Sequence, residues 1–311
     1  MLNRRTFLSQ SALAAGAFLV GPNVSRAAEW FEEDLRLTIL HTNDTHSRID
    51  PFPMDGGRNQ GLGGVAARAH LINEIRKQEE HVLLLDAGDI FQGTPYFNIY
   101  KGEPEIKAMS AMGYDATTIG NHDFDAGLDV LNTQLHRHAS FPMIVSNYDF
   151  SGTPMEHNYQ PYKIFTKGRI KVGVLGIGIE LKGLVPENLY GHTKYLDPVQ
   201  KTAEVAAELK RKGCDLVICL SHLGYKYSEN KISDLILAKE TENVDLIIGG
   251  HTHTFLDAPV SVKNKAGEDV LINQVGFAGI QLGRLDFVFE KRKGKKLLES
   301  APIVVSKKTE I

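Results

Sequence analysis

Asn121, His122 and Asp123 stand together directly after Gly120. They follow the run 116–119, Ala-Thr-Thr-Ile, which is typical of a short buried strand. Three such side chains in a row suit neither a hydrophobic core nor a helix interior. The triplet makes chemical sense if the Asn binds a metal ion and the His faces a reacting group. It therefore predicts a site of metal-assisted chemistry at the end of a strand.

Four other clusters of metal-binding residue types also follow apolar, strand-like runs: Asp44 with His46, Asp89, His222, and His251 with His253. Residues two apart on an extended segment point to the same side, so each of the two pairs can face one ion. Because α/β folds bring their sites together at strand ends, we expect these clusters to meet. Carboxylate, imidazole and amide donors in this number are what a two-metal phosphoester site requires.

Each cluster alone also has an ordinary structural explanation. Asp-x-His and His-x-His pairs arise often by chance, and Asp86-Ala-Gly-Asp89 on its own reads as a turn. A single buried histidine such as His222 is more often a hydrogen-bonded core residue than a ligand. Five clusters, each placed after a strand-like run, outweigh these separate explanations.

Strand-like and helix-like segments alternate along the chain. Strands are expected at 35–40, 82–85, 115–119, 143–145, 162–165, 171–177, 216–220 and 244–248, and helices at 64–78, 103–112, 128–137, 200–212 and 233–239. Antiparallel strands are expected at 270–274, 283–290 and 302–305. This alternation favours an α/β fold with mixed sheets. No linker or repeat marks a second domain, so residues 28–311 read as one domain.

The first 27 residues read as a leader. Asn3-Arg4-Arg5-Thr6-Phe7-Leu8 is a twin-arginine pattern, followed by the weakly apolar run 11–20 and a small-residue site at 25–27. The run is shorter than the about 20 residues that a membrane span needs. We therefore expect a signal peptide over 1–27, export by the twin-arginine route to the periplasm or cell surface, and no membrane span after leader removal.

Net charge argues against one class of partner, and the cysteine positions argue against a disulfide. The formal net charge is -3, so there is no basic surface to indicate a nucleic-acid polymer. The two cysteines, Cys214 and Cys219, lie five apart in an apolar region. On one strand they point to opposite faces, so we expect buried thiols and no mutual disulfide.

Together these residues resemble the calcineurin-like metallophosphoesterase superfamily, whose motifs run D-x-H, G-D, G-N-H-D/E, H and G-H-x-H. Three segments look like the catalytic domain of the 5′-nucleotidase family: Ile39-Leu-His-Thr-Asn-Asp44-Thr-His46, Gly120-Asn-His-Asp-Phe-Asp125 and Gly249-Gly-His-Thr-His253. The likeness runs from about residue 35 to about 290. It implies a four-layer α/β/β/α sandwich of the metallo-dependent phosphatase type, with mixed sheets and a dinuclear site at the strand ends.

The resemblance implies two sets of ligands. One ion would be held by Asp44, His46, Asp89 and His253, and the other by Asp89, Asn121, His222 and His251. Asp89 would bridge them. Nitrogen and oxygen donors without a thiolate fit two divalent ions from among Mn, Zn, Fe and Co. A water or hydroxide held by the ions would attack phosphorus in line.

The expected catalytic pair is His122 and Asp125. His122 would stabilise the transition state or protonate the leaving group, and Asp125 would accept from its other ring nitrogen. The alternative is that Asp125 only caps a helix. Four further residues are expected to contact the ligands and orient them without binding a metal ion: His41, Asn43, Asp86 and Asp123.

The implied activity is release of phosphate from nucleotides by a 5′-nucleotidase type of phosphohydrolase. Other activities on the same scaffold are 2′,3′-cyclic nucleotide phosphodiesterase, UDP-sugar hydrolase and thiosulfohydrolase. A non-catalytic binding subunit is the rival from a different class. Full-length members of the family carry a C-terminal domain that binds the base. Either this chain works alone, or a separately encoded 5′-nucleotidase C-terminal domain is its partner. Five aromatic residues lie near the motifs and are expected to be core, with a partial substrate pocket as the alternative: Phe91, Tyr96, Phe97, Tyr225 and Tyr227.

Overall fold

Five strands form the first sheet, in the order β13-β12-β1-β2-β3. Its strands are β1 (Leu35–Thr42), β2 (Val82–Asp86), β3 (Ala116–Thr117), β12 (Gln281–Glu290) and β13 (Gly294–Val304). β1, β2 and β3 run parallel, whereas β12 and β13 form an antiparallel pair. The computed structural model describes residues 34–290 and 294–307, and the expected leader lies outside them. From Arg36 onward, the described residues form one compact unit.

A second sheet has six strands in the order β10-β11-β9-β8-β6-β5. They are β5 (Tyr162–Lys167), β6 (Ile170–Ile177), β8 (Leu216–Ser221), β9 (Leu246–Gly249), β10 (Val260–Lys263) and β11 (Asp269–Asn273). The four inner strands are parallel and the two edge strands are antiparallel to their neighbours. A separate antiparallel pair joins β4 (Tyr148–Asp149) to β7 (Lys194–Tyr195). Both large sheets are mixed in direction, as expected.

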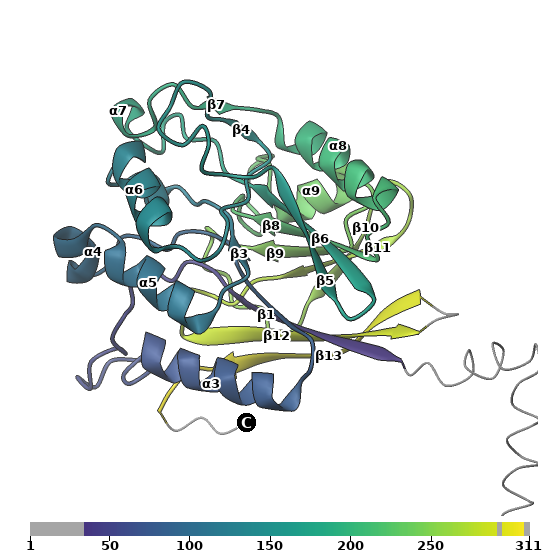
Figure 1. The fold of residues 1–311 in the computed structure, drawn as a ribbon, viewed down its shortest axis with the longest axis horizontal. Coiled ribbons are helices and arrows are strands. Elements are labelled where there is room, and N and C mark those ends of the chain that lie inside the picture. The colour runs from purple at the N-terminus through teal and green to yellow at the C-terminus, as the bar shows by residue number, and fades with distance from the viewer. Residues whose placement is uncertain (1–33, 291–293, 308–311) are drawn as a thin grey trace, which may run out of the picture. The chain divides into compact units, whose positions relative to one another are not determined.

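Helices cover the outer face of each sheet (Figure 1). α3 (Val65–Gln78), α5 (Glu103–Met112) and α6 (Leu128–His138) share a core with the first sheet, and α8 (Pro198–Arg211) and α9 (Asp234–Glu240) share one with the second. The shorter helices are α4 (Pro95–Tyr100), the 3₁₀ helix η1 (His122–Phe124) and α7 (Glu187–Tyr190).

The central strands of each sheet, such as β2, β8 and β9, are buried on both faces, which explains their continuous apolar runs. In β1, Leu40 packs into the core shared with the helices. Its neighbour Ile39 points to the opposite face and is also fully buried. In β8, Cys219 packs toward α8 and α9, whereas the neighbouring Ile218 is buried on the other face. Sheets covered on both sides give the four layers that the resemblance implies.

The strand predicted at 143–145 is wrong. This segment divides its backbone hydrogen bonds among three partners, because Ile144 N donates to Thr117 O at 2.8 Å and Val145 N to Gln160 O at 2.8 Å. Ser146 N donates to Gly176 O at 2.7 Å. The segment therefore links β3 to β6 instead of forming a ladder with one of them. The antiparallel prediction for 270–274 is also only half right, since β11 runs parallel to β9.

Cys214 and Cys219 are free and buried, as expected. The expectation that they point to opposite faces of one strand is wrong, because Cys214 precedes β8 and both side chains pack in the same core. Within residues 34–290 and 294–307, no helix combines the length and apolarity that crossing a bilayer takes.

Candidate metal centre

Loops that follow five parallel strands carry all seven predicted ligands: Asp44 and His46 after β1, Asp89 after β2, Asn121 after β3, His222 after β8, and His251 and His253 after β9. The structure brings them into two groups. The first is Asp44, His46 and His253, and the second is Asp89, His222 and His251. The donor atoms of each group lie within 4.8 Å of one another. Asn121 joins the second group, because its Oδ1 lies 2.8 Å from His251 Nδ1.

Asp89 lies between the two groups. Its Oδ2 is 3.1 Å from His222 Nε2 in its own group and 3.9 Å from His46 Nε2 in the other. Asp44 also reaches across, with Oδ1 3.4 Å from His253 Nε2 and 3.9 Å from His222 Nε2. The geometry thus offers two carboxylates between the groups, and the resemblance assigns the bridge to Asp89.

Hydrogen bonds fix which nitrogen of two histidines faces the site. His222 Nδ1 donates to Ala87 O at 2.7 Å, and His46 Nδ1 donates to Phe91 O at 3.1 Å. Nε2 of each ring is therefore directed at the carboxylates. His222 Nε2 is buried and makes no hydrogen bond of its own. A carbonyl behind the ring and an uncommitted nitrogen in front are the usual setting of a metal-binding histidine, so these residues fit a divalent cation.

Asp89 and His222 each shift the pKa of the other. Burial alone would lower the pKa of His222, but the carboxylates of Asp89 and Asp44 outweigh it and raise that pKa to about 10. Burial would likewise raise the pKa of Asp89, but His222 and His46 hold it well below its usual range. Burial and the charge of His222 lower the pKa of His251 to about 4. The carboxylates therefore favour a positive charge at this point, which a metal ion supplies when it displaces the His222 proton.

Five of the seven predicted ligands have left-handed backbone: Asp44, φ 50°; His46, φ 47°; Asp89, φ 55°; His251, φ 70°; and His253, φ 50°. This region costs an L-residue about 1–2 kcal/mol. The loops hold it through backbone hydrogen bonds, such as Asp44 N to Gly88 O at 2.9 Å and His46 N to Asp89 O at 3.1 Å. Strain of this kind collects at functional sites when the surrounding structure enforces it.

The residues expected behind the ligands lie there. Asp123 accepts from the backbone N–H groups of Asp89, Ile90, Phe91 and Gly120 at 2.8–3.2 Å. Asn43 Nδ2 donates to Asp44 Oδ2 at 2.6 Å. Asp86 Oδ1 accepts from Gly88 N at 2.9 Å, and His41 Nε2 accepts from Asn273 Nδ2 at 3.0 Å. The contacts of Asp123, Asn43 and Asp86 hold loops that carry predicted ligands, whereas the contact of His41 joins β1 to β11.

His122 points into the site from the turn after Asn121. Its Nδ1 lies 2.8 Å from Asp125 Oδ2, and its ring centroid is 5.4 Å from that of His46. The hydrogen bond to Asp125 raises the pKa of His122. Asp125 caps no helix, because α6 begins after Gly127 without a side-chain cap. The contacts therefore match the expected orienting role and not the capping alternative.

Three residues that hold the site in place were not predicted from the sequence. Gln92 Nε2 donates to Asp125 Oδ2 at 3.0 Å, the same oxygen that lies 2.8 Å from His122 Nδ1. Gln274 Oε1 accepts from Thr254 N at 2.8 Å and so holds the loop of His251 and His253. Asp234 Oδ1 accepts from Ser221 Oγ at 2.5 Å, next to His222. Gln274 directly follows β11 (Asp269–Asn273) and stands beside a second amide, Asn273, so the sequence did not single it out.

Asp234→Asn is predicted to flatten the pH dependence of stability. Burial is the main cause that raises the pKa of Asp234 to about 8, above the value near 3.9 of an unfolded chain. The neutral carboxyl therefore stabilises the fold at low pH, and this contribution is lost as the pH rises through about 8. In EDTA, the wild type should lose more unfolding free energy between about pH 5 and about pH 8 than the variant. Equal slopes for wild type, Asp234→Asn and the surface control Asp257→Asn would contradict this.

Gly120→Ala is predicted to destabilise the fold by about 1–3 kcal/mol, because overpacking forces buried atoms apart. A Cβ at Gly120 would overlap Asp89 Oδ1 and lie 2.5 Å from the Asp89 backbone nitrogen. The matched control is Gly57→Ala, whose Cβ would meet only Asp55 Oδ1 at 3.0 Å on the surface. Denaturant unfolding should separate the two variants, and equal midpoints would contradict the prediction.

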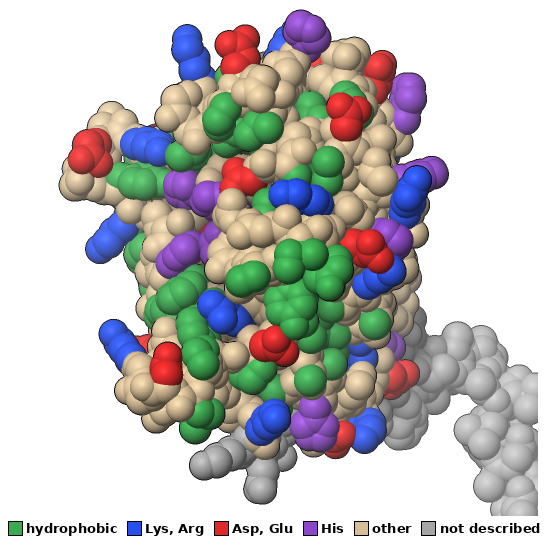
Figure 2. Space-filling view, turned by 90° about the vertical axis from the view of Figure 1, so that its left-hand side faces the viewer, with side chains coloured by type: hydrophobic (Ala, Val, Ile, Leu, Met, Phe, Trp, Pro, Cys, Tyr) green, Lys and Arg blue, Asp and Glu red, His purple; other side chains and the backbone are tan. Residues whose placement is uncertain are grey.

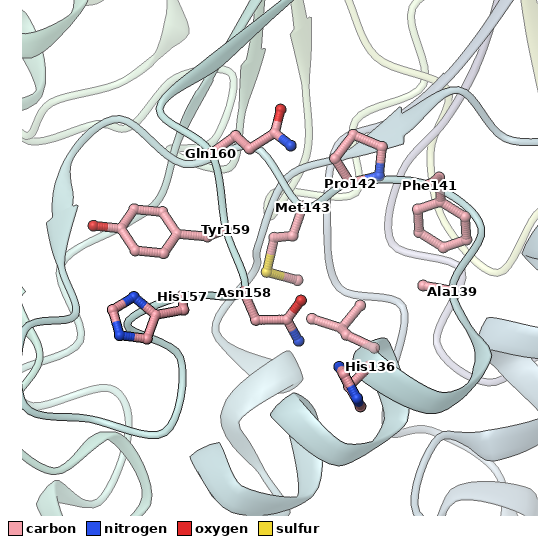
Figure 3. Close-up of a pocket in the computed structure, with 10 residues that line it drawn as sticks. His136, Ala139, Phe141, Pro142, Met143, His157, Asn158, Tyr159 and Gln160 are labelled. Carbon is pink, nitrogen blue, oxygen red and sulfur yellow. The ribbon is translucent and has the colours of Figure 1, made fainter.

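A hollow between the end of α6 and residues 157–160 is a poor candidate for the reaction site (Figure 3). Its volume is about 210 Å³, below the ~300–1,000 Å³ of most ligand pockets. His136 and His157 stand apart in Figure 3, with Asn158 between them, and none of the ten lining residues carries a carboxylate. The chemistry is therefore assigned to the two ligand groups.

Comparisons with known proteins agree with this site. The family described as "Calcineurin-like phosphoesterase" matches residues 37–255. A snake venom 5′-nucleotidase from Gloydius brevicauda is 36% identical over 95% of this chain and 52% of its own length. A 5′-nucleotidase from Vibrio cholerae is 34% identical over 99% of this chain and 59% of its own length.

The crystal structure of a 5′-nucleotidase precursor from Thermus thermophilus has the same fold, with a TM-score of 0.79 and 32% identity. The match covers 88% of this chain and 55% of that one. This chain thus spans somewhat more than half the length of these relatives. The family match includes all seven predicted ligands and the pair His122 and Asp125. The chain belongs to the calcineurin-like phosphoesterase family.

Proposed function

We propose that this protein is a dinuclear metal-dependent phosphohydrolase that releases phosphate from nucleotides, as a 5′-nucleotidase does. The observation that carries the proposal is the meeting of two groups of ligands around Asp89, with His122 beside them. The 5′-nucleotidases of Gloydius brevicauda and Vibrio cholerae support the substrate class.

The proposed ligand sets follow the two groups. Asp44, His46, Asp89 and His253 hold one ion, and Asp89, Asn121, His222 and His251 hold the other. The donors are imidazole nitrogens and carboxylate or amide oxygens, which suit Mn, Zn, Fe or Co. Bound divalent ions lower the pKa of a coordinated water and offset negative charge on the phosphoryl oxygens. The chain itself contributes fixed donor positions on strand ends, which limits reorganisation during the reaction.

His122 is the proposed proton donor to the leaving-group oxygen. Its side chain is 41% exposed and therefore open to a bound substrate, whereas Asp125 is 21% exposed and holds Nδ1. Because Nδ1 of His122 is hydrogen-bonded to Asp125, Nε2 is the ring nitrogen that can face the substrate. The raised pKa of His122 keeps a larger share of the ring protonated near neutral pH, as a general acid requires.

The remaining proposals concern the chain beyond the site. We propose that residues 1–27 are a twin-arginine signal peptide, that 28–311 are one catalytic domain, and that the protein acts in the periplasm or at the cell surface. The Arg4-Arg5 motif supports the export route. The matches cover 52% and 59% of the relatives' own length. We also propose a separately encoded 5′-nucleotidase C-terminal domain as a partner. A pull-down of the exported protein tests for that partner.

A substrate panel tests the activity. The purified chain with Mn²⁺ is assayed on AMP, 2′,3′-cyclic AMP, UDP-glucose and p-nitrophenyl phosphate. We expect phosphate release from AMP with the highest kcat/KM. Turnover of the cyclic substrate alone, or of UDP-glucose alone, would contradict the nucleotidase proposal and favour the corresponding relative. No turnover of any ester, with about one ion per chain or fewer, would favour a non-catalytic subunit.

A further inference from the structure

A row of aromatic rings leads away from the metal centre. Phe277 stacks on the ring of His253, with centroids 5.0 Å apart and an interplanar angle of 12°. Phe255 meets Phe277 edge to face at 6.1 Å and 76°. Phe277 is partly exposed and Phe255 is 43% exposed. We refer to Phe255 and Phe277 as the aromatic ledge.

The ledge is anchored by the same loop that carries Asp44. Ala278 N donates to Asp44 O at 2.6 Å, and Asn43 Nδ2 donates to Gly276 O at 2.6 Å. The Phe255 ring lies directly over Gly276, where a Cβ would overlap it. A bridge between Phe255 and Val275 holds the backbone on the other side. The two rings are therefore fixed relative to the ligands before any substrate binds.

An exposed phenylalanine by itself says little, since much of any protein surface is apolar. Here two rings touch each other, and one of them touches a predicted ligand. Figure 2 shows hydrophobic side chains close to histidines on one face of the molecule. Aromatic rings accept planar partners by offset stacking or edge-to-face contact. Every nucleobase has a flat face, so stacking of this kind holds any of the four bases.

We propose that, in this chain acting without a C-terminal domain, the aromatic ledge binds the base of the nucleotide while its phosphate lies at the metal centre. The catalytic domain then selects phosphate esters with a planar aromatic group over those without one. This inference rests on the proposed function, because it names a specificity surface for the same site. Phe255 and Phe277 are the residues that set the preference.

A second pair of rings is the rival. Tyr96 and Tyr100 on α4 lie 6.4 Å apart at 29° and line a cavity of about 430 Å³ with Ile99. Tyr96 was expected to be core, but this side chain lies at the surface and its hydroxyl donates to Asp50 at 2.7 Å. The ledge is favoured because its own ring contacts His253.

The test compares AMP with ribose 5-phosphate, which has the same phosphoester and no base. For Phe255→Ala, the ratio of kcat/KM for AMP to kcat/KM for ribose 5-phosphate should fall about five- to fiftyfold. Phe255→Leu keeps an apolar side chain and lacks a ring, so it should show most of the same fall. Tyr100→Ala is the matched control and should keep the wild-type ratio. A melting temperature near that of the wild type confirms that each variant is folded.

Two outcomes overturn the proposal: a ratio unchanged in Phe255→Ala, or a fall in Tyr100→Ala with none in Phe255→Ala. Calorimetric binding of adenosine, with ribose as the blank, separates the ledge from the activity. If the wild type hydrolyses neither ester, the proposed function fails. Adenosine binding that weakens at least fivefold in Phe255→Ala still supports the ledge. Adenosine binding that is absent, or equal in both proteins, overturns it.

Discussion

Asp89→Asn is expected to leave the protein with about one ion per chain or fewer, and to lower kcat by roughly 10³-fold or more. The carboxylate lies 3.1 Å from His222 Nε2 and 3.9 Å from His46 Nε2, so its charge acts on both groups. An amide of the same shape keeps one oxygen and loses the negative charge. Elemental analysis of the dialysed protein, together with kcat on AMP, measures both effects.

Asp44→Asn is the informative comparison, because Asp44 also reaches across the two groups. If Asp89 bridges the ions, Asp44→Asn should lose only the ion held with His46 and His253. The second ion, held with His222 and His251, should remain. Equal ion loss in the two variants would contradict the assignment of Asp89 as the sole bridge.

His122→Gln is expected to lower kcat on AMP by about 10²–10⁴-fold while both ions remain bound. The ring is a proposed proton donor, not a ligand, so metal content should be unaffected. A substrate whose leaving group needs no proton is the sharpest probe. The loss on p-nitrophenyl phosphate should therefore be much smaller than the loss on AMP. His136→Gln, at the hollow of Figure 3, is the control and should retain activity.

If His122 donates the proton, Asp125→Asn should shift the pH dependence of kcat. The hydrogen bond from His122 to Asp125 is the main cause that raises the pKa of His122. The protonated ring is the active form, so activity falls as the pH rises through that pKa. Removing the carboxylate lowers the pKa, and the fall in kcat should then occur at lower pH. Equal losses of kcat on AMP and p-nitrophenyl phosphate in His122→Gln would argue against proton donation. So would a fall of kcat at high pH that occurs at the same pH in Asp125→Asn as in the wild type.

Much of the site was predictable because each cluster follows an apolar run. Such runs form parallel strands, and parallel strands that end at one edge bring their following loops together. The expectation that Asp44 and Asp89 lie near each other followed from this rule, whereas their assignment to particular ions came from the resemblance. The helices 103–112 and 128–137 were predictable from their apolar periodicity, and both occur at or within one residue of those bounds.

The parts that were missed depend on contacts between distant segments. Residues 143–146 look like a strand, but their hydrogen bonds go to Thr117, Gln160 and Gly176, which the sequence does not place nearby. The same holds for Gln92, whose neighbour Asp125 is set by the packing of two loops. α4 was missed because Pro95–Tyr100 is too short to show a helical period. Left-handed backbone at Asp44 and Asp89 has no sequence signal beyond the residue type.

That backbone conformation also limits which substitutions these loops accept. Asn, Asp and His occupy positive φ more readily than other side chains, whereas β-branched residues are true outliers there. Exchanging one of these three donor types for another therefore carries little backbone penalty at Asp44, His46, Asp89, His251 and His253. Val, Ile or Thr at the same positions would strain the main chain as well as remove the donor, so the loop shape itself opposes them.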